Sequence, residues 1–147
     1  MSHEVEIGRG KRGRRAYTLD DIALVPARRT RDPEDVNVGW QIDAYHVDIP
    51  LMAAPMDSVM SPETAIAFGR LGGIGVLDLD GLWTRYEDPT PILDRIAHLG
   101  EEESIATLQR VYSEPIKPSL ITARLKQLRE AGVVVAGKLS PQRVQKH

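Results

Sequence analysis

The stretch IPLMAAPMDSVMSPE, residues 49–63, changes from an apolar run to polar side chains at its middle. Residues 51–54, LMAA, show no alternation of apolar and polar side chains, which predicts a short strand buried on both faces, as parallel strands are. Ser61 can cap a helix, Pro62 fits a first helical position, and Glu63 suits the positive end of the helix dipole. A buried strand followed directly by a helix favours an α/β fold.

The rest of the chain repeats this alternation of strands and helices. Two further apolar runs predict buried strands at residues 74–79 and 133–139, and the imperfectly alternating residues 40–50 predict a half-exposed strand. Helical spacing of apolar residues predicts helices at 63–71, 90–99, 101–112 and 118–132. We therefore expect an α/β fold with a parallel sheet. Because a closed (β/α)₈ barrel takes about 250 residues, this chain of 147 residues is expected to be its N-terminal portion, with the first three strands.

The first 16 residues differ in composition from the remainder. They are rich in glycine and arginine and have little to bury, which predicts a flexible basic arm at 1–16, followed by the incomplete barrel at 17–147. Gly8, Gly10 and Gly13 fit the pattern G-x-G-x-x-G, but no strand-turn-helix context surrounds them. A solvated basic tail is therefore favoured over a dinucleotide site.

Composition restricts the function classes. The formal net charge is only -2, and no apolar run approaches the roughly 20 residues that span a bilayer, so we expect a cytoplasmic protein. There is no cysteine, and hence no disulfide or thiol nucleophile in this chain. The four histidines are not at ligand spacing, so no metal site is predicted. A small nucleic-acid-binding protein that uses the basic arm is an alternative, although the sequence shows no aromatic stacking platform.

Polar side chains follow the first two predicted parallel strands, where side chains beyond the carboxyl ends line ligand sites. The candidate substrate-binding residues after the first strand are Ala54, Met56, Asp57 and Ser58, and Asp78 and Asp80 after the second are possible rim residues. Met56 can lie against a flat ring because its thioether is polarizable and adaptable. The alternative is that Met56 is core and that Asp57 ties the turn to backbone amides.

Two separated segments carry a resemblance to a known family. YTLDDIALVPA, residues 17–27, followed by DIPLMAAPMDSVMSPETAIAFGRLGGIGVLD, residues 48–78, resembles the opening of the IMP dehydrogenase/GMP reductase family. The matching positions are Thr18–Asp21, Leu24 and Pro26, then Pro50, Ala54 and Met56–Val59, and finally Gly72–Gly75.

The resemblance implies a purine nucleotide oxidoreductase of guanine nucleotide metabolism. Members are (β/α)₈ barrels, usually homotetramers, that bind IMP or GMP and a nicotinamide cofactor, NAD or NADP, in some cases with a monovalent cation. A cysteine on a later loop attacks C2 of the purine, and a hydride moves between that carbon and the cofactor. Met56 matches the family's methionine near the substrate base, which implies a substrate-side role.

Departures from the family pattern limit what this chain can do. Residues 77–82, LDLDGL, replace the H-x-N-M segment of many dehydrogenases, and only about fifty residues separate the second and third strands, so the CBS modules are absent. Residues 72–93, GGIGVLDLDGLWTRYEDPTPIL, resemble most the IMP dehydrogenase-related branch that lacks them. No catalytic residue is predicted in this chain, because the cysteine is missing, and we expect it to be inactive alone. A non-catalytic nucleotide-binding relative is the alternative, and the direction of the reaction is left open.

Overall fold

The computed structural model describes residues 4–25 and 32–144 and divides the chain into two compact units between Val36 and Asn37. The first unit contains strands β1 (Glu4–Gly8) and β2 (Lys11–Arg14) and the 3₁₀ turns η1 (Leu19–Asp21) and η2 (Pro33–Asp35). Part of the predicted basic arm is therefore an antiparallel hairpin. Gly10, with φ 69°, permits its tight turn. The predicted division into an arm at 1–16 and an incomplete barrel at 17–147 stays a prediction.

The second unit begins with another hairpin, formed by β3 (Trp40–Ile42) and β4 (Tyr45–Val47). A single half-exposed strand was predicted over these residues. The chain instead reverses at Asp43, whose φ of 49° lies in the left-handed region that aspartate tolerates better than most residues. The alternation that predicted one strand thus belongs to two short strands that pair with each other.

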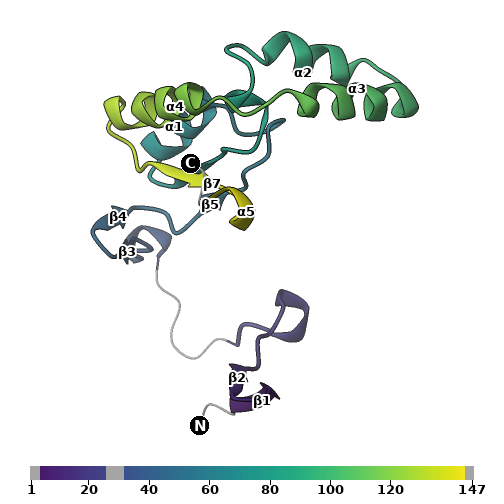
Figure 1. Cartoon of the computed structure of the whole chain (residues 1–147). Helices are drawn as coiled ribbons and strands as arrows, with labels where there is room; N and C mark the ends of the chain where they lie inside the picture. The colour runs from purple at the N-terminus through teal and green to yellow at the C-terminus, as the bar shows by residue number, and fades with distance from the viewer. Residues whose placement is uncertain (1–3, 26–31, 145–147) are drawn as a thin grey trace. The chain divides into compact units, whose positions relative to one another are not determined.

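A three-stranded parallel sheet forms the centre of the second unit (Figure 1). Its strands are β5 (Met52–Ala53), β6 (Ile74–Asp78) and β7 (Ala136–Lys138), in the order β5-β6-β7. All three lie within the apolar runs that predicted strands. The α/β class and the parallel sheet are confirmed.

The four predicted helices are all present, and they are α1 (Pro62–Arg70), α2 (Thr90–Ala97), α3 (Glu101–Ser113) and α4 (Pro118–Glu130). A 3₁₀ turn η3 (Leu82–Thr84) follows β6, and a short helix α5 (Pro141–Val144) follows β7. The predicted cap of α1 is formed, because Oγ of Ser61 accepts a hydrogen bond from the backbone N–H of Thr64 at 3.0 Å. No helix among the described residues is long and apolar enough to cross a bilayer.

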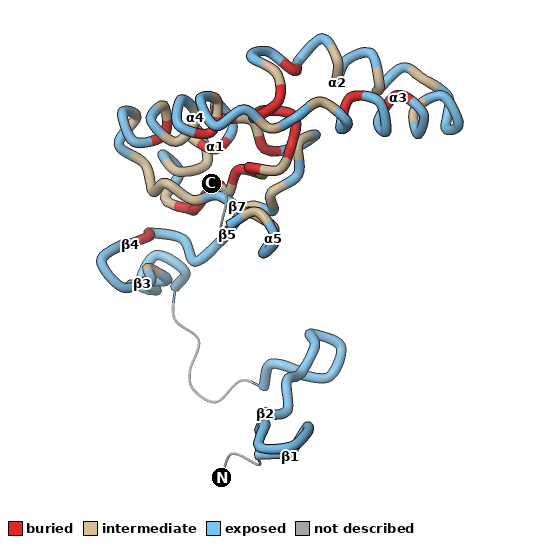
Figure 2. Tube along the Cα trace, viewed as in Figure 1, coloured by how far each residue is buried: buried red, intermediate tan, exposed pale blue. Residues whose placement is uncertain are grey.

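The core lies where α1 and α4 pack over β6, and Figure 2 shows buried residues along β6 and the loop after it. Leu77 of β6 and Leu128 of α4 are almost inaccessible, at 1% and 0% exposure. α1 approaches β6 so closely that a Cβ at Gly75 would lie 2.6 Å from Cα of Ala65. Glycine is therefore required at this crossing.

The prediction that residues 51–54 are buried on both faces was wrong. The side chain of Met52 is 61% exposed and that of Leu51 is 56% exposed. The strand at 133–139 is also shorter and less buried than predicted, with Gly137 and Lys138 exposed. The physical reason is position, because β5 and β7 are the two edges of the sheet in the described chain and only β6 has a strand on each side.

Candidate functional site

A cavity of about 440 Å³ lies beyond the carboxyl ends of β5 and β6. The loop after β5 contributes Met56, Asp57 and Ser58, and the end of β6 contributes Asp78. Helices α2 and α3 supply the opposite wall, which is mainly apolar and consists of Leu93, Ile96, Leu108 and Tyr112. The cavity thus combines an apolar wall with two carboxylates, of Asp57 and Asp78, and the hydroxyl of Ser58.

Four of the six candidate residues from the sequence line this cavity. Ala54 is exposed and Asp80 is partly buried, and neither belongs to the cavity wall. Met56 is 50% exposed, so it is not the plain core residue of the alternative interpretation. Contact of these residues with a substrate stays a prediction.

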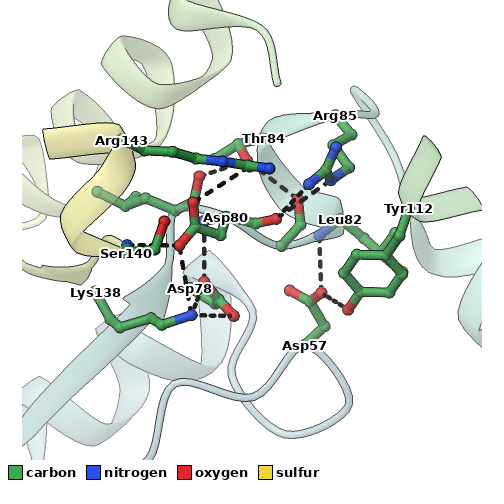
Figure 3. A network of polar contacts seen from close by, with 12 residues as sticks. Asp57, Asp78, Asp80, Leu82, Thr84, Arg85, Tyr112, Lys138, Ser140 and Arg143 are labelled. Atoms are coloured by element: carbon green, nitrogen blue, oxygen red, sulfur yellow. Dashed lines mark hydrogen bonds and ion pairs between the residues drawn. The ribbon is translucent and has the colours of Figure 1, made fainter. Parts of the chain in front are cut away.

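Asp57 ties together loops that are distant in sequence (Figure 3). Its Oδ2 accepts a hydrogen bond from the backbone N–H of Leu82 at 2.8 Å and another from the hydroxyl of Tyr112. Its Oδ1 is buried and has no hydrogen-bond partner among the described residues. Burial raises the pKa of Asp57, although the two hydrogen bonds oppose this shift. The alternative role predicted for Asp57, binding a backbone amide, is therefore present in the fold.

Tyr112, near the end of α3, is a cavity residue that the sequence analysis did not identify. Burial raises the pKa of its phenol and the hydrogen bond to Asp57 raises it further, so the hydroxyl remains protonated and acts as the donor. Tyr112 and Asp57 are 55 positions apart. No local sequence pattern predicts such a pair, and the only sequence signal is a tyrosine near the end of an amphipathic helix.

Asp78 and Asp80 belong to a second polar cluster, which links the ends of β6 and β7 (Figure 3). Nζ of Lys138 lies 3.3 Å from a carboxylate oxygen of Asp78 and 3.5 Å from one of Asp80. The carboxylate of Asp80 also accepts the backbone N–H of Ser140 at 2.7 Å and pairs with Arg143 at 3.3 Å. Partial desolvation would raise the pKa of Asp80, but these donors and cations outweigh it and lower the pKa. Asp80 thus has a structural role in this fold.

A buried arginine holds the loop after β6 in place. Arg85 is only 5% exposed, and its Nε and Nη2 donate to the carbonyl oxygen of Asp80 at 3.2 and 2.9 Å. Its Nη1 donates to the carbonyl oxygen of Glu114, just after α3. The loop that carries Leu82 is therefore fastened to the end of α3, which fixes one side of the cavity.

The chemistry available in the cavity is binding and orientation. An apolar wall and a thioether suit the face of a flat ring, and a carboxylate beside them can accept hydrogen bonds. The sequence has no cysteine, so this chain contributes no thiolate. Within residues 4–25 and 32–144, no three histidines or carboxylates form a group that could hold a metal ion.

Comparison with known proteins shows which proteins this chain is similar to. Residues 16–84 match the IMP dehydrogenase / GMP reductase domain. An uncharacterized oxidoreductase of Mycolicibacterium smegmatis is 43% identical over 146 residues, which cover 96% of this chain and 39% of that protein. The inosine-5'-monophosphate dehydrogenase of Methanocaldococcus jannaschii is 42% identical over 64 residues, 44% of this chain and 13% of that enzyme.

A solved structure agrees with these matches over nearly the whole chain. The crystal structure of an IMP dehydrogenase/GMP reductase-like protein from Corynebacterium glutamicum superposes with a TM-score of 0.80 at 39% identity. The match covers 97% of this chain and 40% of that protein, so the chain spans about two fifths of the length of such relatives. The two sequence segments singled out for their resemblance, 17–27 and 48–78, both lie within the matched residues 16–84. This chain belongs to the IMP dehydrogenase/GMP reductase family.

Proposed function

We propose that this chain supplies one wall of the purine nucleotide site in an oxidoreductase of the IMP dehydrogenase/GMP reductase type. In the proposed reaction, a hydride moves between C2 of IMP or GMP and a nicotinamide cofactor, NAD or NADP. The observation that carries the proposal is the cavity beyond β5, where Met56 and Asp57 lie at the positions of the family motif. The half-exposed thioether of Met56 would lie against the purine ring.

We also propose that the complete protein is a (β/α)₈ barrel. The parallel order β5-β6-β7, with α1 joining the first two strands, is compatible with the first three strands of a (β/α)₈ barrel. A cavity at the carboxyl ends of the strands is where ligand sites of such barrels lie. Family membership also supports the predicted homotetramer and cytoplasmic location, both of which remain predictions.

The residues present indicate which parts of the reaction this chain would support. The nicotinamide cofactor supplies hydride chemistry when bound, whereas this chain's residues bind and orient the purine. A covalent step at C2 requires a thiolate, and the sequence contains no cysteine, so that nucleophile would come from residues outside this sequence. No residue of this chain is assigned to the cofactor or to a monovalent cation.

Methyl NMR of the full chain tests nucleotide binding, because its methionines sample different environments. With methyl-labelled methionine, IMP or GMP is expected to shift the resonance of Met56, which lines the cavity. Met60, 2% exposed in the core, and Met52, 61% exposed but outside the cavity wall, are internal controls. An unchanged Met56 resonance, or equal shifts at all three methionines, would contradict the proposal.

A chimaera tests the chemistry separately from binding. Residues 1–147 are joined to the remainder of the Corynebacterium glutamicum relative, and absorbance of the reduced cofactor is followed with IMP and NAD or with GMP and NADPH. Turnover in either direction supports the oxidoreductase. Nucleotide binding without turnover, where the unaltered relative turns over, would favour the non-catalytic nucleotide-binding alternative.

A further inference from the structure

The contact between Tyr112 and Asp57 joins α3 to the loop after β5. We propose that Tyr112 is a positioning residue of the nucleotide cavity, whose hydroxyl holds the Asp57 carboxylate in place while its ring forms part of the wall. Only the identity of the ligand rests on the proposed function. The segment between β6 and β7 would then contribute to the site, in addition to the family motif after β5.

The hydrogen bonds of Asp57 show why its position depends on Tyr112. Oδ2 receives two donors, the N–H of Leu82 and the hydroxyl of Tyr112, and Oδ1 receives none among the described residues. Removing the hydroxyl leaves a half-buried carboxylate with a single donor. A carboxylate that loses a donor in a desolvated place rotates or becomes protonated, because the remaining contacts do not compensate its desolvation.

Tyr112 is itself held from more than one side. The guanidinium of Arg85 lies 5.5 Å from the centre of its ring, within the range of cation–π attraction. One residue earlier, the carbonyl oxygen of Val111 accepts a hydrogen bond from the hydroxyl of Tyr86 at 3.1 Å. The Tyr112 ring therefore has a contact with Arg85 in addition to the one that its hydroxyl makes with Asp57.

Three groups face Asp57 from the elements around it. Tyr112 comes from α3, Asp78 from β6 and Arg85 from the end of η3. Desolvation raises the pKa of Asp57 most, and the negative charge of Asp78 adds to this rise. The hydroxyl of Tyr112 lowers the pKa, as do the N–H of Leu82 and the charge of Arg85. Loss of the Tyr112 hydroxyl alone is therefore expected to move this pKa further upward.

The carboxyl carbon of Asp57, followed by NMR against pH in the absence of nucleotide, measures this effect directly. Tyr112→Phe removes the hydroxyl but keeps the ring, and its titration is expected at higher pH than that of the unaltered chain. Tyr86→Phe is the matched control, because it removes a hydroxyl that also bonds to α3 without touching Asp57. Identical titrations of Asp57 in the unaltered chain and in Tyr112→Phe would overturn the proposal.

The nucleotide readout uses the Met56 methyl shift as a function of GMP concentration. Loss of one charge-assisted hydrogen bond in the site is expected to weaken binding about tenfold in Tyr112→Phe, and by less than about twofold in Tyr86→Phe. If the unaltered chain binds neither GMP nor IMP, the proposed function fails and the nucleotide part of this inference fails with it. The titration of Asp57 still decides whether Tyr112 positions the carboxylate.

A reciprocal measurement guards against misfolding of Tyr112→Phe. In the unaltered chain the ring carbons of Tyr112 are expected to shift in the acid range as Asp57 titrates. In Asp57→Asn that shift should vanish, and the ring carbons of Tyr86 should respond equally little in both chains. An acid-range shift of Tyr112 that persists undiminished in Asp57→Asn would show that another carboxylate, such as Asp78, causes it, and would overturn the positioning role.

Discussion

Gly81 lies directly against the carboxylate of Asp57, with no space for a side chain between them. A Cβ at position 81 would lie 2.6 Å from Cγ of Asp57. The backbone of Gly81 is extended, with φ -85° and ψ -166°, so the requirement concerns space and not a left-handed conformation. The loop after β6 and the loop after β5 therefore meet at backbone-to-carboxylate contact, which also brings the N–H of Leu82 within 2.8 Å of Oδ2.

Gly81→Ser tests this close approach. The added Cβ must displace Asp57, and we expect the free energy of unfolding to fall by about 1–3 kcal/mol, as overpacking typically causes. Gly100→Ser is the matched control, since Gly100 also precedes a helix and has open space where its Cβ would lie. Urea unfolding of both variants should show no loss for Gly100→Ser, because serine is a good capping residue. Equal effects at both positions would contradict the contact.

The pH dependence of stability should reveal the buried carboxyl of Asp57. Its pKa is raised above the ordinary value of 3.8 mainly by burial, so the native state holds this proton more tightly than the unfolded chain. The contribution of Asp57 to stability is therefore full below pH 3.8 and falls as pH rises to the raised pKa. Urea unfolding measures the free energy of unfolding of the unaltered chain and of Asp57→Asn. As pH rises through this window, the unaltered chain should lose stability relative to Asp57→Asn, and above the window the difference should stay constant. A relative gain with rising pH would contradict this assignment.

Asp80 is expected to show the opposite sign. Although partial desolvation acts against it, the Ser140 amide, Lys138 and Arg143 lower the pKa of Asp80. Its contribution is therefore present above the ordinary pKa and is lost as pH falls through the lowered one. Asp80→Asn should reduce the free energy of unfolding at neutral pH by about 1–3 kcal/mol, with little difference in strong acid. Asp94→Asn, at an exposed position of α2 with no ion pair in the described chain, should have little effect at either pH.

Met56→Ala separates ligand contact from folding. Because Met56 is 50% exposed, its loss should change the free energy of unfolding by less than about 1 kcal/mol. The lost apolar contact with a purine ring should weaken GMP binding about fivefold or more, as measured by calorimetry. Met52→Ala is the control, since Met52 is also more than half exposed, at 61%, but lies outside the cavity wall. Unchanged affinity in Met56→Ala would remove Met56 from the site.

Apolar periodicity and helix-capping residues predicted most of the helices and strands of the second unit. The four helices and the parallel β6 follow from local features, such as the Ser61 cap and the apolar run at residues 74–79, that act within a few positions of the chain. The same features did not predict burial, which depends on the elements that lie next to a strand in the folded protein. The run at residues 51–54 is apolar enough for a buried strand, but β5 is short and exposed because it lies at an edge of the sheet.

The candidate site shows the same division. The motif at Met56–Ser58 and its place after a strand could be predicted from the sequence alone. The structure has a cavity at this position. The partners of Asp57 could not be predicted, because Leu82 lies 25 positions and Tyr112 lies 55 positions away. Local sequence determines where a helix or strand begins and which residues follow it. The path of the chain through space decides which distant groups meet a carboxylate, and hence its hydrogen bonds, its burial and its pKa.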